Sequence, residues 1–199
     1  MLIKSIITKY IFYFCATLIS MNVLALFRKV KAFVFDIDGV LTDGKVLLLP
    51  DLHPDGKLMM ARTMHTKDGY ALQLAVKLGY PVAIISGGKN SGAEQRLAYL
   101  GIKHIFMGIE HKLECFDSFL QSQGLQREEV LYMGDDIPDY DILKVAGVKT
   151  CPADAVSEIK AIADYISPFK GGDCCARDVI EKVLKLQGNW HIDTTARSI

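Results

Sequence analysis

The 199-residue sequence has no excess of charge of either sign. Lysine and arginine together number 23, aspartate and glutamate also number 23, and the formal net charge is therefore zero. This balance indicates neither a basic surface for nucleic acid nor an acidic tail, although a local patch stays compatible with it. No nucleic-acid partner is expected. Half of the residues are hydrophobic, which is enough for one substantial core, so we expect one main domain.

Cysteine is too scarce for a disulfide framework. The five cysteines are odd in number, and no Cys-x-x-Cys pair or histidine at zinc spacing accompanies them. A reduced, cytoplasmic environment is therefore expected. We interpret the adjacent Cys174 and Cys175 as small apolar packing residues, with a redox-active pair as the alternative.

Long hydrophobic runs are also rare, with one exception near the amino terminus. Residues 10–27 are uncharged, just long enough to span a membrane, and lie between lysines at 4 and 9 and basic residues from 28 onward. No clear cleavage site follows, and the basic residues favour keeping the main domain in the cytoplasm, which disfavours a secretory signal. Three interpretations stay open for this segment: translation that starts at Met21, a membrane anchor, or a packed helix. Membrane contact is expected only if it is an anchor.

We therefore divide the chain into an apolar segment (1–27), a main domain (28–188) and a polar tail (189–199) that is expected to be mobile. In the main domain, short apolar runs alternate with helical patterns, which predicts an α/β fold: a three-layer, Rossmann-like parallel sheet flanked by helices. Residues 45–49 and 57–65 flank a turn rich in proline, aspartate and glycine, and predict a projecting β-hairpin. Expected strands are 31–36, 81–86, 104–107, 130–134 and 148–151, and expected helices are 68–78, 91–100, 112–122, 140–146 and a last one ending near 186.

The first expected strand ends in two carboxylates, Asp36 and Asp38, one residue apart. In an open α/β sheet, ligands bind outside the carboxyl ends of the strands, so both acids are expected at the edge of a site. One carboxylate can attack while the other moves protons. A calcium loop is disfavoured because Val40 occupies the next ligand position and Leu48 stands where a glutamate is required.

Three later segments offer matching chemistry. Ser86, followed by two glycines, provides a hydroxyl and backbone N–H groups for phosphate oxygens. Lys112 stands at an expected helix start, where its ammonium and the helix dipole both favour an anion. Asp135 belongs to an acidic group that follows another apolar strand. Crowded carboxylates are costly without a cation, so a hard divalent metal is expected between Asp36 and Asp135.

Taken in order, these four segments resemble the motifs of the haloacid dehalogenase superfamily of phosphotransferases. The resemblance implies that Asp36 is a nucleophile that forms an aspartyl-phosphate, and that Asp38 is the acid and base. It implies that Ser86 and Lys112 hold the phosphoryl oxygens. It also implies a Mg²⁺ ion bound by the Asp36 carboxylate, the Asp38 backbone carbonyl and Asp135. Around these ligands, supporting roles are expected for Asp136 and Asp139.

The chain leaves no room for a large cap domain, which indicates a capless member of the superfamily. The Asp-x-Asp-Gly-Val-Leu-Thr-Asp-Gly segment, the hairpin, the Lys-Asp-Gly-Tyr segment at 67–70 and the Gly-Gly pair at 171–172 resemble the 3-deoxy-D-manno-octulosonate 8-phosphate phosphatase family over residues 30–188. The resemblance implies a phosphatase for this phosphorylated sugar acid, in lipopolysaccharide biosynthesis. It also implies a homotetramer that contacts through the hairpins, in which a neighbouring subunit helps to close each site.

The family resemblance assigns the sugar-acid contacts, but this chain departs from the family pattern at three places. Lys67 and Gln73 stand where arginine is common, and Gly88 follows Ser86-Gly87 where arginine is usual. Lysine lacks the planar fork with which arginine binds a carboxylate. A nine-carbon keto-deoxy sugar acid 9-phosphate is therefore the alternative substrate. The expected substrate contacts are Asp38, His65, Thr66, Lys67, Asp68, Gly69, Arg96 and Lys112.

Two non-enzymatic functions are the remaining alternatives. A receiver domain would make the chain a phosphoacceptor switch, but its acid pair normally precedes the phosphorylated aspartate on another strand, whereas Asp38 follows Asp36. An oligomerisation module, like the phosphatase-like domain attached to some sialic-acid cytidylyltransferases, would not need the complete acid set. The sequence therefore favours an enzyme that turns over.

Overall fold

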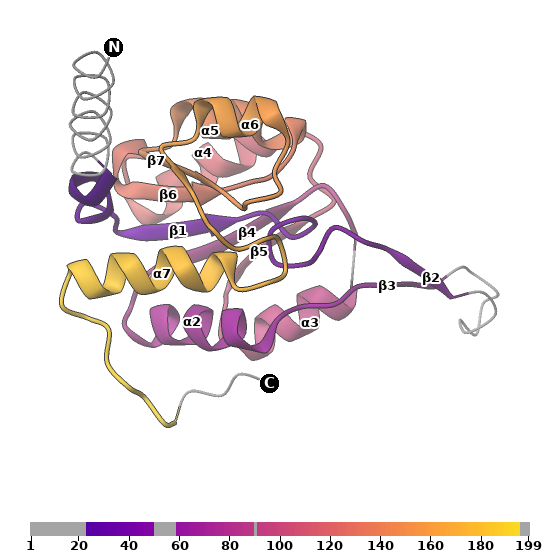
Figure 1. Cartoon of the computed structure of the whole chain (residues 1–199), viewed down its shortest axis with the longest axis horizontal. Coiled ribbons are helices and arrows are strands. Elements are labelled where there is room, and N and C mark those ends of the chain that lie inside the picture. Colours follow the sequence, from indigo (N-terminus) through magenta and orange to yellow (C-terminus); the bar gives the residue numbers. More distant parts are fainter. Residues whose placement is uncertain (1–22, 50–58, 90, 196–199) are drawn as a thin grey trace, which may run out of the picture.

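The computed structural model describes residues 23–49, 59–89 and 91–195 (Figure 1). Met21, most of the apolar segment and the expected hairpin turn lie outside the described residues, so the interpretations of that segment stay predictions. Its described part, residues 23–27, is helical, and Phe27 is fully buried. Among the described residues, no helix has both the length and the apolar character needed to cross a membrane.

A sheet of six parallel strands forms the centre of the molecule, in the order β5-β4-β1-β6-β7-β8. Strands β1, β4 and β6 are buried throughout because helices cover both faces of the sheet, which explains their apolar sequences. The predicted fold class and its five strands are confirmed, whereas the two-residue β8 is an addition. The strands are β1 (Ala32–Phe35), β4 (Val82–Ser86), β5 (His104–Met107), β6 (Val130–Met133), β7 (Val148–Cys151) and β8 (Tyr165–Ile166).

Helices form a layer on each face of the sheet (Figure 1). One layer holds α2 (Thr66–Lys77), α3 (Ser91–Tyr99) and α7 (Cys175–Leu186), and the other holds α4 (Lys112–Gln123), α5 (Tyr140–Val145) and α6 (Ser157–Ile162). Because successive strand residues point to opposite faces, Phe33 and Phe35 of β1 pack in the first core and Val34 in the second. Two short 3₁₀ turns, η1 (Arg127–Glu129) and η2 (Ile137–Asp139), precede β6 and α5.

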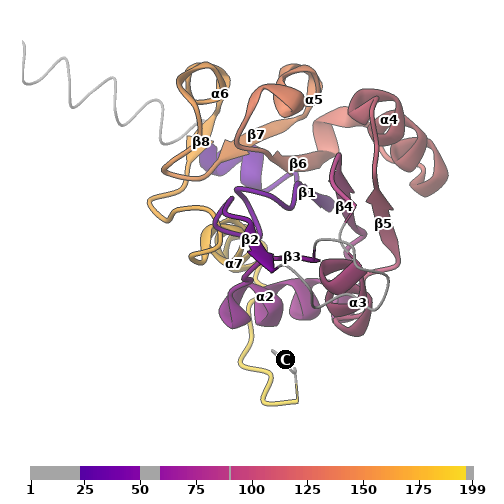
Figure 2. The same ribbon diagram turned by 90° about the vertical axis from the view of Figure 1, so that its right-hand side faces the viewer.

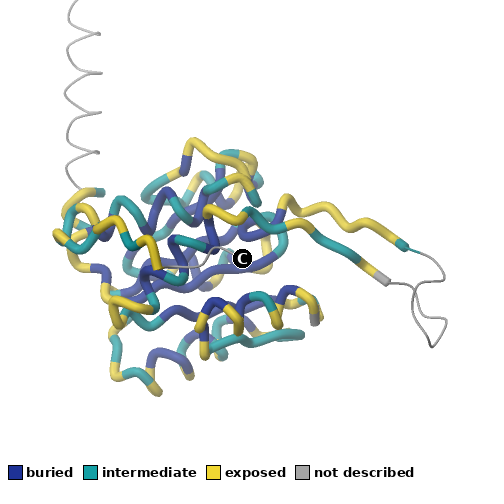
Figure 3. The backbone as a smooth tube through the Cα atoms, turned by 90° about the horizontal axis from the view of Figure 1, so that it is seen from below, coloured by how far each residue is buried: buried dark blue, intermediate teal, exposed yellow. Residues whose placement is uncertain are grey.

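The predicted hairpin is confirmed as a two-stranded antiparallel ladder of β2 (Leu47–Leu49) and β3 (Met59–Ala61). Figures 1 and 3 show it extending away from the rest of the domain, and Figure 2 looks along it from its tip. Its apolar side chains face solvent: Leu47 is 61% exposed, Leu48 55% and Met60 50%. A single chain therefore leaves a hydrophobic arm uncovered, which is unusual for an isolated domain.

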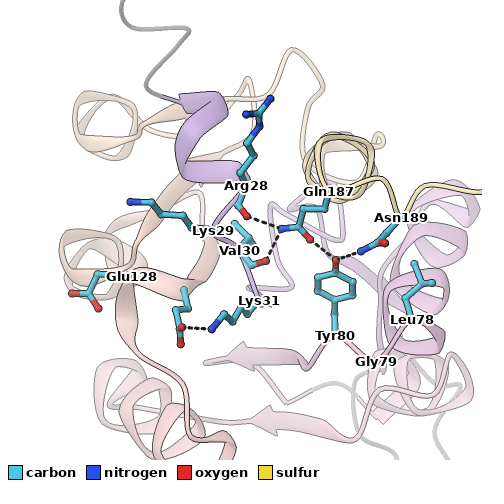
Figure 4. Close-up of a pocket in the computed structure, with 11 residues that line it drawn as sticks. Arg28, Lys29, Val30, Lys31, Leu78, Gly79, Tyr80, Glu128, Gln187 and Asn189 are labelled. Carbon is cyan, nitrogen blue, oxygen red and sulfur yellow. Dashed lines mark hydrogen bonds and ion pairs between the residues drawn. The ribbon is translucent and has the colours of Figure 1, made fainter.

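The end of α7 lies against the end of the sheet at which the strands begin (Figure 4). The side-chain amide of Gln187 donates to the carbonyl oxygens of Arg28 (3.3 Å) and Val30 (2.7 Å) and accepts from the Tyr80 hydroxyl. Asn189 in turn donates to that hydroxyl at 2.7 Å. These groups border a cavity of about 600 Å³. It lies where the strands begin, at the end of the sheet away from the acidic motifs.

The described part of the tail, 189–195, contacts α2 and α7. Trp190 meets Tyr70 edge to face at 6.2 Å between ring centroids, and Arg177 lies 5.4 Å over the Trp190 ring. Asp193 is 3.0 Å from Lys77. These contacts give 189–195 a defined place against the domain, whereas the polar composition alone predicts a mobile segment.

Candidate active site

The acidic strand ends meet at the carboxyl edge of the sheet. Asp36 directly follows β1, Ser86 ends β4 and Asp135 lies two residues beyond β6. The strands β4, β1 and β6 are neighbours in the sheet. After β1 the chain first adds β4 and β5 on one side of β1 and then β6 on the other side, and such a reversal of strand order opens a crevice at the carboxyl ends of the strands. With Lys112 from the start of α4, these three residues line a cavity of about 290 Å³. The other lining residues are Asp38, Gly39, Gly44, Gly87, Gly88, Asp136, Pro138 and Asp139.

Lys112 is held between two carboxylates. Its Nζ lies 3.1 Å from Asp36 Oδ1 and 2.8 Å from Asp139 Oδ1, and its side chain is 7% exposed. Burial disfavours the charged ammonium, but Asp36 and Asp139 together outweigh burial and raise the pKa of Lys112. The lysine therefore stays charged, and its ammonium is held in place at the start of α4.

Asp139 organises this corner of the site. Its Oδ1 accepts a hydrogen bond from the Tyr132 hydroxyl at 2.6 Å as well as from Lys112, and its Oδ2 accepts from the Asp135 backbone N–H at 3.1 Å. Both oxygens are thus occupied. The supporting role expected for Asp139 has a structural basis in these bonds, and Tyr132, a core strand residue, joins the network without any sign in the sequence.

The carboxylates of Asp36 and Asp135 have fewer hydrogen-bond partners than that of Asp139. Asp36 Oδ1 and Asp135 Oδ1 are buried and have no hydrogen-bond partner in the described part of the chain, although Asp36 Oδ1 faces the Lys112 ammonium. Burial, followed by repulsion from Asp139, raises the pKa of Asp36 to about 7 against the opposing effect of Lys112. Burial and repulsion from Asp139 and Asp136 also raise the pKa of Asp135 to about 7. Lys112, which is shared with Asp139, therefore compensates the negative charge at these positions only in part.

This arrangement fits a hard divalent cation. Carboxylate oxygens of Asp36, Asp135 and Asp139 lie within 4.8 Å of one another, and those of Asp139 are already committed. Asp36 and Asp135 are then the available donors, and Mg²⁺ prefers such oxygens in small numbers with the rest of its shell taken by water and phosphate. A cation here would offset the repulsion that raises both pKa values.

The loop after Asp38 approaches the Asp135 side chain so closely that only glycine fits. Gly39 has φ +82, and a Cβ at this position would overlap the Asp135 carboxylate. Gly134 similarly leaves room for Asp139. The glycines of both acidic motifs thus allow the carboxylates to crowd together.

Arg62 is a site residue that the sequence analysis did not single out. It follows β3 on the returning arm of the hairpin, and its Nε and Nη2 lie 2.6 and 3.1 Å from the two carboxylate oxygens of Asp38. The Arg62 side chain is 9% exposed. Thr42 adds a weaker bond to Asp38 at 3.3 Å. A fork-shaped pair of this kind fixes a carboxylate in both position and orientation. The one sequence signal was a lone arginine beside the apolar stretch Met-Met-Ala.

Arg62 also reaches the place where an arginine was expected after Ser86-Gly87. A Cβ on Gly88 would lie 3.3 Å from Asp38 Oδ2, 3.6 Å from Ser86 Oγ and 3.9 Å from Arg62 Nη2. The hairpin residue Arg62 therefore places a guanidinium at the side of the cavity where Gly88 stands instead of the expected arginine.

Most of the predicted sugar contacts lie elsewhere in the single chain. Asp68 is 2% exposed, and its two oxygens accept from the backbone N–H groups of Arg177 (2.7 Å) and Cys174 (3.2 Å), which ties α2 to α7. Burial raises the pKa of Asp68. Lys67 borders a separate cavity beside α7. Within the described residues, the acidic cavity is not lined by His65, Thr66, Lys67, Asp68, Gly69 or Arg96, whose substrate roles stay predictions.

Comparison with known proteins places this geometry in a family. Residues 69–153 match the model of the haloacid dehalogenase-like hydrolases. The chain is 32% identical over 174 residues to the 3-deoxy-D-manno-octulosonate 8-phosphate phosphatase of Escherichia coli K12, covering 87% of the chain and 89% of the relative. It is 31% identical over 171 residues to the phosphatase of the same name from Haemophilus influenzae, covering 85% and 91%.

Solved structures agree with the sequence comparison. The 3-deoxy-D-manno-octulosonate 8-phosphate phosphatase of Moraxella catarrhalis, in complex with a magnesium ion, a phosphate ion and a KDO molecule, superposes with a TM-score of 0.78 at 29% identity, covering 84% of this chain and 93% of that one. The Yersinia pestis phosphatase of the same name gives 0.79 at 27% identity, covering 89% and 91%. The structural similarity thus covers most of the chain. The chain belongs to the 3-deoxy-D-manno-octulosonate 8-phosphate phosphatase family of haloacid dehalogenase-like hydrolases.

Proposed function

We propose that this chain is a Mg²⁺-dependent phosphatase that hydrolyses 3-deoxy-D-manno-octulosonate 8-phosphate to 3-deoxy-D-manno-octulosonate and phosphate, in lipopolysaccharide biosynthesis. The observation that carries the proposal is the group of Asp36, Lys112, Asp135 and Asp139 at the carboxyl edge of the sheet, with one buried oxygen on each of Asp36 and Asp135 that accepts no hydrogen bond from the described residues. The identity of 32% to phosphatases of this name supports the same substrate.

Asp36 and Asp135, with the backbone carbonyl of Asp38, are the residues that would hold Mg²⁺. When bound, the ion neutralises the crowded carboxylates and withdraws charge from the phosphoryl group. The magnesium in the Moraxella catarrhalis structure and the cobalt-bound form of the Haemophilus influenzae phosphatase support a divalent cation as the cofactor.

In the first half of the reaction, an Asp36 carboxylate oxygen attacks phosphorus. The bond between phosphorus and the sugar oxygen breaks, and Asp38 donates a proton to that oxygen, so the sugar leaves as an alcohol. Lys112 is already charged and placed 3.1 Å from Asp36, where it holds phosphoryl oxygens as negative charge moves onto them. The Ser86 hydroxyl assists from the end of β4.

In the second half, water hydrolyses the aspartyl-phosphate. Asp38, now ionised, takes a proton from the water as its oxygen attacks phosphorus, and the bond to Asp36 breaks to release phosphate. Arg62 keeps Asp38 over the cavity in both halves through its two hydrogen bonds. A reversible acid and base must reach two different oxygens in turn, so this orientation is part of the mechanism.

The enzyme acts as a homotetramer assembled through its hairpins. The exposed apolar side chains of Val46, Leu47, Leu48 and Met60 support this assembly. Among the described residues, six of the eight expected sugar contacts do not line the cavity of about 290 Å³, which also supports closure by a second subunit. Replacing Leu47 and Leu48 by lysine should yield monomers by light scattering, and tetramers that persist would contradict the proposed interface.

The site of action is the cytoplasm, with membrane contact only if residues 10–27 form an anchor. The free thiols of Cys115, Cys151, Cys174 and Cys175 support a reducing compartment. Cell fractionation tests the location, and the mass of the mature chain distinguishes a start at Met1 from one at Met21. Recovery in the periplasm would contradict the proposal.

The deciding experiment measures phosphate release from 3-deoxy-D-manno-octulosonate 8-phosphate and from nine-carbon 9-phosphate analogues, with and without Mg²⁺. We expect Mg²⁺-dependent preference for the eight-carbon ester, abolished in Asp36→Asn and kept in Asp117→Asn, a surface control. Preference for a nine-carbon ester would overturn the substrate and point to Lys67, Gln73 and Gly88. No release from any ester, with stable phosphorylation of Asp36 by a small phosphodonor, would overturn the hydrolase in favour of a switch.

A further inference from the structure

Three side chains with different metal-binding chemistry meet where α2 and α7 begin, outside the acidic cavity. His65 precedes α2, and Asp173 and Cys174 precede α7. One ligand atom from each lies within 4.8 Å of the others. His65 and Cys174 are half-buried and Asp173 is exposed, so a cation from solvent has access. We propose that His65, Asp173 and Cys174 form a second metal site, which takes a divalent cation that favours thiolate and imidazole, such as Zn²⁺.

The sulfur and the imidazole are close enough for one zinc ion to bind both after the ring turns. Zinc binds sulfur at about 2.3 Å and imidazole nitrogen at about 2.0–2.1 Å, and at a tetrahedral angle these bonds place the two ligand atoms about 3.6 Å apart. Cys174 Sγ lies 3.6 Å from His65 Nδ1 and 3.7 Å from Nε2, so it is almost equally far from both nitrogens, and the imidazole must rotate to direct one lone pair at an ion shared with the sulfur. The Asp173 carboxylate supplies the third ligand and water the fourth.

The donor set separates this site from the Mg²⁺ site. Magnesium takes oxygen ligands, whereas sulfur and imidazole together select zinc, cobalt and related transition metals. The acids Asp68 and Asp173 lie near the Cys174 thiol, but so do the cations Lys67 and Arg177. The local charge is therefore mixed, and selection rests on the kind of donor and not on the charge of the site.

Long-range packing holds the ligands in place. His65 and Cys174 are 109 positions apart in the chain. The buried Asp68 carboxylate fastens the start of α7 by accepting from the Cys174 and Arg177 backbone N–H groups. Cys174 has φ 75, and in the described part of the chain it is the one residue other than glycine with a positive φ. Surrounding structure thus holds Cys174 in a backbone conformation that L-residues rarely adopt, beside the imidazole.

Metal binding replaces one hydrogen bond of His65 and the S–H bond of Cys174. His65 Nδ1 accepts a hydrogen bond from the Lys67 N–H at 3.1 Å, so the neutral ring carries its proton on Nε2 and has its lone pair on Nδ1. The cation takes the place of this helix-capping bond at Nδ1. At Cys174 the S–H bond breaks as the sulfur–metal bond forms, and the proton goes to solvent.

A bound cation would join α2 and α7 beside the catalytic loop. Gly171 and Gly172 come just before Asp173, and Gly172 N–H donates to the Val40 carbonyl at 2.8 Å. A Cβ on Gly171 would overlap the Gly39 carbonyl, so this segment lies directly on the loop that carries Asp36 and Asp38. The second site would therefore fasten the start of α7 to the start of α2, next to the loop that carries Asp36 and Asp38.

The test is a Co²⁺ titration of the reduced, metal-free full-length chain, followed by near-ultraviolet absorption. Thiolate-to-Co²⁺ charge transfer reports sulfur ligation, and the acidic cavity has no sulfur ligand. We expect a saturable band at one equivalent that Zn²⁺ displaces. The band should vanish in Cys174→Ser, weaken at least tenfold in affinity in His65→Ala, and persist in the matched control Cys115→Ser. No band, or a band that survives Cys174→Ser, overturns the proposal.

A second measurement avoids dependence on the folding of these variants. Zn²⁺ should protect Cys174 of the unmodified chain from alkylation at least tenfold, measured by peptide mass spectrometry, and leave Cys115 unprotected. Mg²⁺ at the same concentration should protect neither thiol. Equal protection by both ions, or by neither, overturns the proposal.

Discussion

Replacing Asp36 by asparagine should stabilise the metal-free protein at neutral pH while it abolishes phosphate release. The wild-type carboxylate is 7% exposed and lies near Asp139 in a corner where one ammonium, that of Lys112, opposes several acids. Asparagine keeps the shape and removes the charge. Loss of activity with a gain in stability is the pattern expected when a group is retained for chemistry and not for folding.

The magnitude follows from the pKa of Asp36, which burial and then repulsion from Asp139 raise from 3.8 to about 7. The folded state binds this proton more tightly than the unfolded state, so stability falls as pH rises from the unfolded to the folded pKa, at about 1.4 kcal/mol per pH unit. The total is at most about 4 kcal/mol and is approached only above pH 8, because half of the folded molecules still hold the proton at pH 7. Between pH 5 and pH 7, the advantage of Asp36→Asn in free energy of unfolding should therefore grow by about 2 kcal/mol. Placing an uncharged amide beside Lys112 can carry a cost that does not depend on pH. Such a cost changes the free energy of unfolding of Asp36→Asn equally at pH 5 and at pH 7.

The assay is urea unfolding in EDTA at pH 5, 6, 7 and 8, compared with the control Asp117→Asn. Asp117 has a 42% exposed side chain and pairs with Arg127 at the surface, so its variant should follow the wild-type pH dependence. Adding Mg²⁺ at pH 8 should stabilise the wild type more than Asp36→Asn and narrow the gap. A gap that does not change with pH, or one that shrinks as pH rises in EDTA, would refute the electrostatic account.

Three further predictions concern the surroundings of these carboxylates. Gly39→Ala should lose at least about 3 kcal/mol in free energy of unfolding and more than tenfold in activity. The reason is that its Cβ would overlap the Asp135 carboxylate at a residue with positive φ. The control Gly124→Ala, with φ +64 and open space around the Cβ, should lose only about 1 kcal/mol. Urea unfolding measures both, and equal losses would contradict the overlap. Arg62→Ala should lower kcat about 10- to 100-fold and Arg62→Lys less, since one ammonium cannot hold both Asp38 oxygens; an unchanged kcat in phosphate-release assays would count against this role. EDTA should abolish phosphate release and Mg²⁺ restore it, and activity that survives chelation would argue against the metal site.

Local sequence patterns were enough to predict the sheet and to place the acidic residues at its carboxyl edge. Strands 104–107 and 148–151 were predicted with the bounds that the structure shows, and the four interior helices begin or end within two residues of their expected limits. Short apolar runs that end in acids are local signals, and a parallel sheet brings such ends to one edge whatever the details of packing. Segments α6 and β8 were missed, and the two residues of β8 are too few to display a period.

Only the tertiary structure decided how the side chains are paired. Arg62 lies 24 positions from the Asp38 carboxylate that it holds, and His65 lies 109 positions from Cys174. Such partners depend on the register of the hairpin and on the packing of α2 against α7, neither of which leaves a local pattern in the sequence. The orphaned oxygens of Asp36 and Asp135 likewise emerge only after Asp139 has taken its three hydrogen bonds, because a shortage of donors is a property of the assembled site.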